Sequence, residues 1–405
     1  MQKLVIVGGG MASARLLEEL HARAPDRYAI EVHGEEPEGH YNRVLLSPVL
    51  AGEMAASEII THPPAWHAER GIRFFGGDPV VAIDRARRRL RTRSGAESGY
   101  DQLVLATGSS ALRPTLPGMA LPGVLAFRDL RDLAQLEAGI RRGGRALVVG
   151  GGVLGLEAAM ALRHRGLDVC VLNRSGALME RQLDAEASGL LRAELERQGL
   201  RFELHAETQA LLGEERVTAL QLRDGRVLAA DLVLFATGIA PRIALAQAAG
   251  LSCGRGIQVD DALRSSDAAI SAVGECLEHR GQCYGLVAPV YEQARVLAAR
   301  LAGESTAHYP GSATSLKLKV SGIELFSAGE FVGAEGDELL RYRDPRRGIY
   351  KKLVLRAGRL VGAVLIGDAR DSGWYFELIQ SGQPIGAWRR SLLFGRAYCL
   401  VADAA

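Results

Sequence analysis

The chain has 405 residues, of which 48% are hydrophobic and 48 are glycine. This length and composition predict a soluble α/β protein of two or three domains with many tight turns. The formal net charge of +2 gives no global field that would favour nucleic acid or an anionic membrane as a partner. No apolar run reaches membrane-spanning length, and the N-terminus has the pattern of a buried strand rather than a signal peptide. We therefore expect a cytoplasmic protein.

A strand–turn–helix pattern opens the chain. An apolar β-branched run at residues 3–7 leads directly into three glycines and an amphipathic helix. This is the order of a dinucleotide-binding turn, in which Gly8 makes the tight turn and Gly10 lets the backbone approach a pyrophosphate. The helix N-terminus adds free N–H groups and a partial positive charge. The expected contacts are Gly8, Gly10, Met11, Ala12 and Ser13, with Ser13 in place of the third glycine.

Residues after this turn supply further candidate contacts for the same dinucleotide. A second strand, residues 28–33, is followed by Gly34-Glu35-Glu36, and an acidic residue there hydrogen-bonds the adenosine ribose hydroxyls. Glu35 is the first candidate and Glu36 the alternative. Arg43 lies just beyond, where a guanidinium can clamp the pyrophosphate. A later strand ends in Ala106-Thr107-Gly108, which we assign to the same site.

The pattern then repeats, and the repeat makes the first fingerprint far more specific. Residues 145–149 form an apolar run, all three glycines follow, and an alanine-rich helix comes next. A strand ending in Ala236-Thr237-Gly238 mirrors the earlier Ala-Thr-Gly strand. The candidate contacts of a second dinucleotide are Gly150, Gly152, Val153, Leu154, Gly155, Glu157, Asn173, Arg174, Thr237 and Gly238.

The end of the strand after the second fingerprint bears on the choice of nucleotide. Proteins that select NADH commonly place a carboxylate there, which binds the ribose hydroxyls and repels a 2′-phosphate. Here the strand ends at Asn173-Arg174. The sequence therefore predicts weak discrimination, with NADPH at least tolerated.

The remaining pattern predicts how these parts are arranged. Helices are expected at about 129–141 and 190–198. A strand-like segment, residues 269–275, returns to the first domain and precedes a helix through 290–301, with Pro289 at its first position. From about Thr314 apolar and charged residues alternate, as in a small α+β domain.

The predicted fold class is therefore α/β, with two Rossmann-like dinucleotide-binding domains and a small C-terminal α+β domain. The second Rossmann-like domain is inserted in the first. The expected boundaries are 1–112 with 243–310 for the first domain, 113–242 for the second and 311–405 for the third.

The cysteines argue against several kinds of site. The five cysteines are scattered without C-x-x-C spacing, so no disulfide framework, zinc site or iron–sulfur cluster is indicated. The sequence calls for no acid–base or nucleophilic triad, and we expect no metal site.

These motifs together resemble the two-dinucleotide, glutathione-reductase-like flavoprotein superfamily, over residues 1 to about 305. The resemblance implies FAD in the first domain and NAD(P)H in the second, held against the flavin. It assigns Gly274 and Glu275 to the ribityl chain, and the positive end of the helix at Pro289 to the flavin N1/O2 edge. Glu157 resembles the residue that orients the nicotinamide carboxamide. A helix N-terminal carboxylate favoured by the dipole is the alternative interpretation of Glu157.

Branches within that superfamily differ in their local motifs. The redox cysteine pair of the disulfide-reducing members is missing, because no cysteine precedes Cys170. The segment Tyr41-x-Arg43-x-x-Leu46-Ser47 resembles the rubredoxin and ferredoxin reductases, which adds Ser47 to the candidate FAD contacts. Pro48 stands where many of those proteins have a lysine beside the flavin.

A closer resemblance runs through residues 179–184, 284–294, 316–322 and 373–376. It is to the flavin portion of NAD(P)H-dependent assimilatory nitrite reductase large subunits and to the electron-transfer subunits of assimilatory nitrate reductases. Nothing in the sequence resembles the iron–sulfur or sirohaem modules of the large nitrite reductases. We therefore expect the electron acceptor to lie on another chain.

The sequence leaves three functions open. The first is an FAD subunit that takes hydride from NAD(P)H and feeds a separate molybdenum and iron–sulfur nitrate reductase. The second is a free-standing reductase of rubredoxin or ferredoxin. The third is a regulatory flavoprotein whose cofactor never turns over, which rapid flavin bleaching by NADH would exclude.

Overall fold

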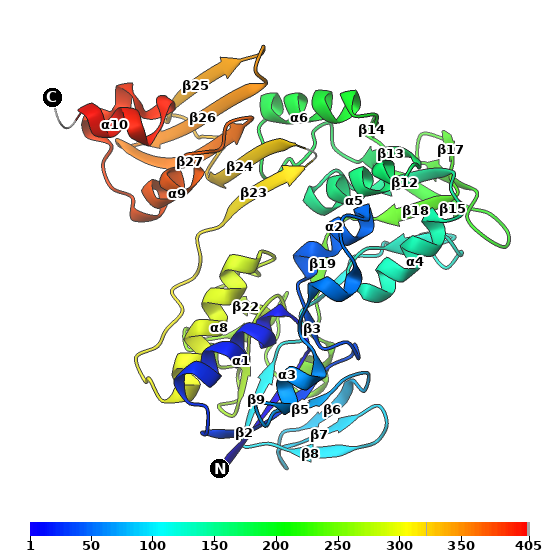
Figure 1. Ribbon diagram of the computed structural model, residues 1–405, viewed down its shortest axis with the longest axis vertical. Coiled ribbons are helices and arrows are strands. Elements are labelled where there is room, and N and C mark those ends of the chain that lie inside the picture. Colours follow the sequence, from blue (N-terminus) through cyan, green and yellow to red (C-terminus); the bar gives the residue numbers. More distant parts are fainter. Residues whose placement is uncertain (321, 403–405) are drawn as a thin grey trace.

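The computed structural model describes residues 1–320 and 322–402. Three five-stranded sheets organise the described chain (Figure 1). Two sheets are parallel and the third is antiparallel. We call the regions around them the first unit, the second unit and the C-terminal unit. This arrangement confirms the predicted fold class of two Rossmann-like sheets and a further small domain.

The first unit is built on the sheet β21-β9-β1-β2-β5. Its central strands are almost continuously buried, as expected for parallel strands covered on both faces. Helices α1 and α8 lie side by side against this sheet (Figure 1). The bounds are β1 (Gln2–Val7), α1 (Met11–Arg23), β2 (Tyr28–His33), β5 (Arg73–Phe75), β9 (Gln102–Leu105), β21 (Ile270–Ala272) and α8 (Val287–Ala302).

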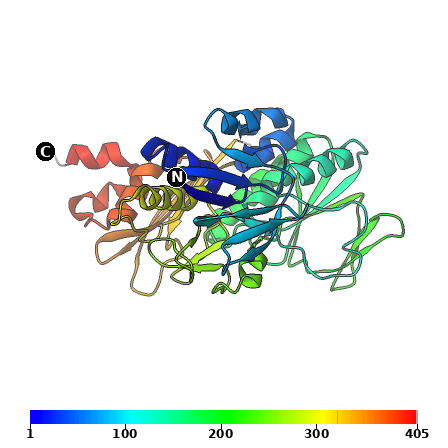
Figure 2. The same cartoon turned by 90° about the horizontal axis from the view of Figure 1, so that it is seen from below.

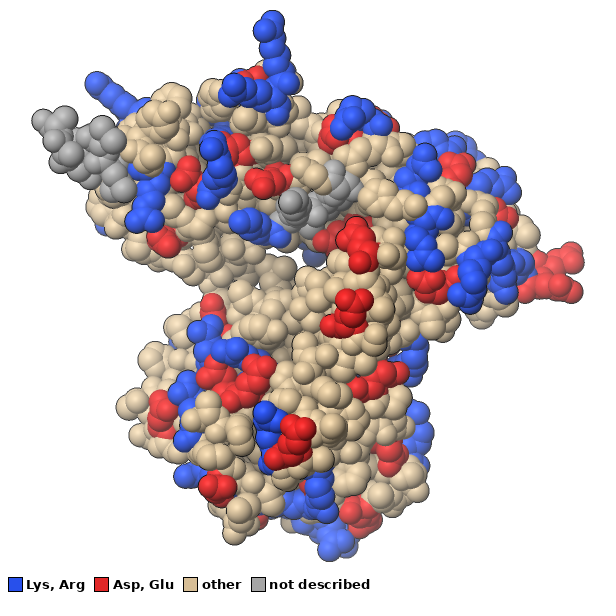
Figure 3. All heavy atoms as spheres, viewed as in Figure 1, with Lys and Arg blue, Asp and Glu red and all other residues tan. Residues whose placement is uncertain are grey.

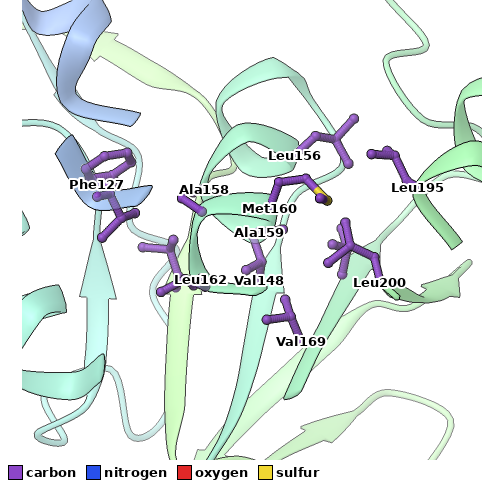
Figure 4. Packing of buried hydrophobic residues seen from close by; sticks show 14 of the residues in the cluster. Phe127, Val148, Leu156, Ala158, Ala159, Met160, Leu162, Val169, Leu195 and Leu200 are labelled. Carbon is purple, nitrogen blue, oxygen red and sulfur yellow. The ribbon is translucent and has the colours of Figure 1, made fainter. Parts of the chain in front are cut away.

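The second unit repeats this plan on the sheet β11-β18-β12-β13-β14. Small side chains on α5 let the helix lie close to the sheet, and Figure 4 shows Ala158 and Leu162 on the side of Phe127 and Met160 on the side of Leu195. The bounds are β11 (Val124–Ala126), α4 (Leu130–Ile140), β12 (Arg145–Val149), α5 (Val153–His164), β13 (Asp168–Asn173), α6 (Ala185–Arg197), β14 (Arg201–Leu204) and β18 (Leu232–Phe235).

Two short antiparallel strands carry the chain between these units. They are β10 (Ser109–Ala111) and β19 (Ile239–Pro241), and they follow the two Ala-Thr-Gly segments directly. The threonine hydroxyls reinforce this ribbon, because Thr107 donates to the Arg242 carbonyl at 2.8 Å and Thr237 donates to the Leu112 carbonyl at 3.1 Å. The crossing point is therefore held by side chains as well as by strand pairing.

The C-terminal unit is an antiparallel sheet of order β23-β24-β27-β26-β25. Residues Ala357 and Gly358 both have positive φ, which suits a two-residue hairpin turn. The bounds are β23 (Ser315–Val320), β24 (Ile323–Gly329), β25 (Glu338–Asp344), β26 (Ile349–Arg356), β27 (Arg359–Ile366), α9 (Ser372–Ser381) and α10 (Arg396–Ala402). Seen from below, α10 and the hairpin at β17 (Val227–Ala229) lie at opposite ends of the molecule (Figure 2).

The C-terminal unit packs against the second unit. Tyr350, Val364 and Ile366 belong to the same buried cluster as α5 and α6. Asp184 accepts a hydrogen bond from the Tyr350 hydroxyl and pairs with Lys352, both at 2.9 Å. The surface is hollowed between the C-terminal unit and the first unit (Figure 3).

Smaller elements complete the fold, and α2 packs against α5 of the second unit. They are β3 (His40–Tyr41), α2 (Leu46–Ala51), β4 (Ile60–His62), α3 (Pro64–Ala68), β6 (Val80–Asp84), β7 (Arg89–Thr92), β8 (Glu97–Gly99), β15 (Thr208–Leu212), β16 (Ala219–Leu222), α7 (Ala244–Ala248), β20 (Ile257–Val259) and β22 (Leu277–His279). Short 3₁₀ segments cover Arg43–Leu45, Ala56–Ile59, Gly386–Arg390 and Leu392–Phe394.

Two expected helix starts were wrong. Helix α6 begins at Ala185 rather than near 190, because the Asp184 carboxylate accepts from the Ala187 amide and caps it. Pro289 occupies the third position of α8 rather than the first. A proline is tolerated there because the N–H groups of a first turn have no partner inside the helix. No helix in the described residues is long and apolar enough to cross a membrane.

Candidate functional site

The first glycine turn has the geometry that a pyrophosphate site requires. Gly8 has a φ of +126°, and a Cβ there would lie 2.0 Å from the Ala106 carbonyl oxygen. A Cβ on Gly10 would have no described atom within 4 Å. Gly8 is therefore needed for the tight turn, whereas Gly10 keeps the approach to the N-terminus of α1 open.

The second turn is built in the same way. Gly150 has a φ of +125°, and its Cβ would lie 2.4 Å from the Ala236 carbonyl oxygen, whereas Gly152 again has no described atom within 4 Å. A Cβ on Gly155 would lie 2.0 Å from the Gly150 oxygen. The residues present therefore fit two dinucleotides, one at the N-terminus of α1 and one at the N-terminus of α5.

The third fingerprint position separates the two turns. Ser13 is fully buried, and its hydroxyl lies 2.8 Å from the Gly10 carbonyl oxygen and 2.9 Å from Nε2 of His40. The side chain that departs from the glycine pattern thus has polar partners of its own.

The two candidate ribose carboxylates are held by arginines. Glu35 pairs with Arg242 at 2.5 Å and with Arg131 at 3.4 Å. Burial alone would raise the pKa of Glu35, but the hydrogen bond and charge of Arg242, with those of Arg131, outweigh it and lower the pKa. Glu36 accepts from the Tyr41 hydroxyl at 2.7 Å and from Arg43 at 2.5 Å.

Arg43, the expected pyrophosphate clamp, lies between the two units. Nη1 of Arg43 donates to the Arg128 carbonyl at 3.0 Å. The guanidinium group lies over the Tyr41 ring, 4.6 Å from the ring centroid. These contacts fix the cation in one orientation. Contact of Arg43 with a pyrophosphate stays a prediction.

The closing strand meets the first fingerprint at Gly274. Gly274 has a φ of +90°, and a Cβ there would lie 2.8 Å from Cβ of Ala12. Its amide donates to Gln293 of α8 at 2.9 Å. The next residue, Glu275, accepts from Ser109 at 2.7 Å and pairs with Arg128. The ends of β21, α1 and α8 therefore come together at one edge of the first sheet.

Glu157 and Ser47 join the two units. The Ser47 hydroxyl donates to Oε2 of Glu157 at 3.0 Å across 110 positions of sequence. Burial raises the pKa of Glu157, although the Ser47 hydrogen bond lowers it in part. The carboxyl group thus lies in a partly apolar junction between α2 and α5. Its role toward a nicotinamide stays a prediction.

The end of β13 divides its tasks between two residues. Asn173 accepts from the Gly151 amide at 3.0 Å and donates to the Ala177 carbonyl at 2.8 Å, so it supports the second glycine turn. Arg174 is exposed. The His205 ring lies within 2.7 Å of where a Cβ on Gly176 would be, which brings an imidazole to the same strand end.

Sequence reasoning missed several residues at these sites. Arg128, Arg131 and Arg242 hold candidate carboxylates, and His40 and His67 lie behind the first turn. Their partners are distant in sequence, so no local pattern signalled them. Within the described residues no group of three or more His, Cys, Asp or Glu could hold a metal ion.

Comparison with known proteins agrees with this geometry. Residues 2–297 match the family described as pyridine nucleotide-disulphide oxidoreductase. The chain belongs to this family. Residues 315–383 match the rubredoxin NAD+ reductase C-terminal domain. The protein is accordingly an NAD(P)H-dependent flavoprotein oxidoreductase that uses FAD and transfers electrons.

Two relatives of this oxidoreductase bear the names of nitrite and nitrate reductase systems. It is 44% identical over 95% of its length to a nitrite reductase [NAD(P)H] of Bacillus subtilis, and 40% identical over 97% to an assimilatory nitrate reductase electron transfer subunit of the same organism. The chain covers 48% and 51% of these two proteins, about half of their length.

A solved structure resembles almost the whole fold. A ferredoxin reductase for the CYP199A2 system from Rhodopseudomonas palustris superposes with a TM-score of 0.86 at 27% identity, covering 95% of this chain and 96% of that one. The likeness extends through all three units.

Proposed function

We propose that this oxidoreductase is an electron-transfer component that takes a hydride from NAD(P)H and feeds a separate metal-containing reductase, specifically an assimilatory nitrate reductase. The similarity to the nitrate reductase electron transfer subunit, over 97% of the chain, carries this proposal. FAD, when bound, accepts two electrons together and can release them singly to a metal centre. The chain's own residues bind and orient the two dinucleotides.

In this proposal the first unit holds FAD. Backbone N–H groups after Gly10, together with Arg43, bind the pyrophosphate, and Glu35 binds the adenosine ribose. Gly274 and Glu275 hold the ribityl chain, and Ala106-Thr107-Gly108 and Ser47 complete the site. The first turn of α8, which contains Pro289, directs its partial positive charge to the flavin.

The second unit, proposed as residues 113–242, holds NAD(P)H. The turn from Gly150 to Gly155 binds its pyrophosphate, and Thr237 and Gly238 close the site. Glu157 orients the nicotinamide carboxamide. The hydrogen bond from Ser47 supports this role, because it ties Glu157 to the proposed flavin-binding unit.

The test uses purified protein loaded with FAD. With NAD(P)H it should reduce ferricyanide or viologen-type dyes, and it should consume nitrate only when a molybdenum-containing nitrate reductase is added. Nitrate reduction needs a metal that holds the oxyanion, and the described residues offer no such cluster. Nitrite formed by the flavoprotein alone would refute the proposal.

Two specific findings favour other acceptors. The nitrite reductase relative is 44% identical, which supports a sirohaem-containing nitrite reductase as the acceptor. Residues 315–383 match a rubredoxin reductase domain, which supports rubredoxin. Parallel assays with each acceptor decide between them. If the protein turns over with rubredoxin but not with the molybdoprotein, rubredoxin rather than nitrate reductase is its electron acceptor.

A further inference from the structure

A chain of four hydrogen-bonding contacts runs behind the first glycine turn. It starts at the Pro63 carbonyl, 3.0 Å from Nδ1 of His67, and continues from Nε2 of His67 to Nδ1 of His40 at 3.0 Å. Nε2 of His40 then lies 2.9 Å from the Ser13 hydroxyl, which lies 2.8 Å from the Gly10 carbonyl. The chain therefore ends on the residue that precedes α1.

When the three side chains are neutral, they supply one proton fewer than the four contacts need. Both ends are carbonyl oxygens, which only accept, so four contacts need four protons between them. A neutral His67, a neutral His40 and Ser13 supply one each, which makes three. With one extra proton, His67 donates at both nitrogens, His40 donates to Ser13, and Ser13 donates to Gly10. Every contact is then satisfied.

The surroundings hold this extra proton back while no anion is near. His40 and His67 are fully buried, and their ring centroids lie 5.0 Å apart. Burial holds the pKa of His40 well below its ordinary value, and nearby His67, His62 and Arg43 lower it further. Burial also lowers the pKa of His67.

The other charged groups around the pair act in both directions. Nε2 of His62 lies 3.0 Å from Oε1 of Glu18, so the negative charge of Glu18 would compensate a proton on His62. Arg70 lies over the Trp66 ring at 4.3 Å and opposes protonation of His67. Phe74 packs against the rings of both His67, at 4.7 Å, and His40, at 5.9 Å, and carries no charge. An anion at the turn is the missing partner that would favour the proton.

We propose that Ser13, His40 and His67 form a proton-binding site that takes up one proton when the pyrophosphate of FAD binds at the N-terminus of α1. The added positive charge lies behind the first helical turn and adds to the field of the helix N-terminus. These three are positioning residues for the cofactor. Proton uptake and FAD binding then strengthen each other.

The first experiment measures proton uptake by the apoprotein as FAD binds. Calorimetric titrations between pH 5.5 and 8, in buffers of different ionisation heat, give the number of protons taken up. We expect uptake approaching one proton in part of this range. The dissociation constant of FAD should fall on acidification by up to about tenfold per pH unit. No uptake anywhere in the range overturns the proposal.

Variants distinguish a proton-binding role of these hydrogen-bonded side chains from a merely structural one. Ser13→Ala leaves two contacts and two protons, and His67→Phe leaves two contacts supplied by His40 and Ser13, so neither needs an extra proton. Both should lose the pH dependence of FAD affinity, whatever their affinity at high pH. His62→Gln is the matched control, because His62 lies outside the chain and pairs with Glu18. The His62→Gln variant should keep the pH dependence of FAD affinity. Loss of this pH dependence in His62→Gln, together with its retention in Ser13→Ala, would contradict the proposal.

A measurement on the unaltered protein needs no variant. Nitrogen chemical shifts distinguish a protonated ring nitrogen from an unprotonated one. At pH 8 one ring nitrogen of His67 should be unprotonated in the apoprotein, and FAD binding at lower pH should leave both nitrogens protonated. A His67 ring whose protonation is the same under all conditions would overturn the assignment.

Discussion

Two glycines two positions apart have opposite tasks in each turn. Gly150 is required by the backbone, because its φ is +125° and a methyl group would meet the Ala236 carbonyl at 2.4 Å. Gly152 has a φ of −86° and no described atom within 4 Å of a Cβ. Folding and ligand binding therefore place different demands on the same motif.

This contrast gives the first prediction. Gly150→Ala should destabilise the protein by at least about 3 kcal/mol, from the strained φ and the clash together. Gly152→Ala should cost about 1 kcal/mol or less, yet raise the KM for NAD(P)H by about tenfold or more, because its methyl group lies where the pyrophosphate approaches. Urea unfolding and steady-state kinetics measure the two effects. Equal loss of stability in both variants would contradict the division of tasks.

Nucleotide choice is also decided by single residues. No carboxylate directly follows β13, Arg174 is exposed, and His205 lies against Gly176 two residues further on. NADPH should therefore be accepted, and Arg174→Glu should lower kcat/KM for NADPH relative to NADH by about tenfold, or roughly 1.4 kcal/mol. Kinetics with both donors test this. A preference of the unaltered protein for NADH above ~100-fold would mean that Asn173 and Arg174 do not act as proposed.

Buried histidines predict how the stability of the apoprotein changes with pH. Burial lowers the pKa of His33, His40, His62 and His67 from the ordinary 6.5. The unfolded chain then binds more protons than the folded chain. The contribution of these histidines to the free energy of unfolding is therefore complete above pH 6.5 and is lost as the pH falls below that value.

His33 offers a sharp variant of this prediction. Neither ring nitrogen has a hydrogen-bond partner among the described residues, and the ring stacks on Phe75 at 4.8 Å. His33→Phe keeps the stack and removes the titrating group. It should flatten the slope of unfolding free energy against pH by up to about 1.4 kcal/mol per pH unit between pH 5 and 6.5. A slope unchanged from that of the unaltered protein would show that His33 does not contribute.

At the scale of elements, Asp184 links α6 to the C-terminal sheet. It caps α6 through the Ala187 amide and accepts from Tyr350 and Lys352. Burial opposes ionisation of Asp184, but these hydrogen bonds outweigh it and lower its pKa. Lys352 is almost completely buried, and Asp184 is its ion-pair partner.

Asp184→Ala should therefore cost about 3–5 kcal/mol, because it leaves a buried cation without its partner. Lys352→Met is the matched control and should cost much less, since it removes the charge itself and leaves the Asp184 cap in place. Unfolding free energies measure both. The proteolytic sensitivity of residues 303–314, which join α8 to β23, reports detachment of the C-terminal unit. Similar costs for the two variants would contradict this account.

At the scale of the whole molecule, the C-terminal unit shares a buried core with the second unit and faces the first across a hollow (Figure 3). The first and second units meet through the ribbon β10–β19, through Ser47 and Glu157, and through the arginines on Glu35 and Glu275. Movement of the second unit would carry the C-terminal sheet with it. This coupling is a property of the packing, since no single motif contains it.

The sequence by itself determined the two strand–turn–helix units and the alternating apolar and charged pattern of the C-terminal domain. Tight turns need glycine at particular φ values, and apolar periodicity identifies buried strands and helix faces, so these features are local. Tertiary structure decided the pairing of Glu275 with Arg128 and the hydrogen-bonded series from Ser13 through His40 to His67. These contacts join residues far apart in sequence. They exist only once sheets and helices have packed, and short-range propensity carries no information about that packing.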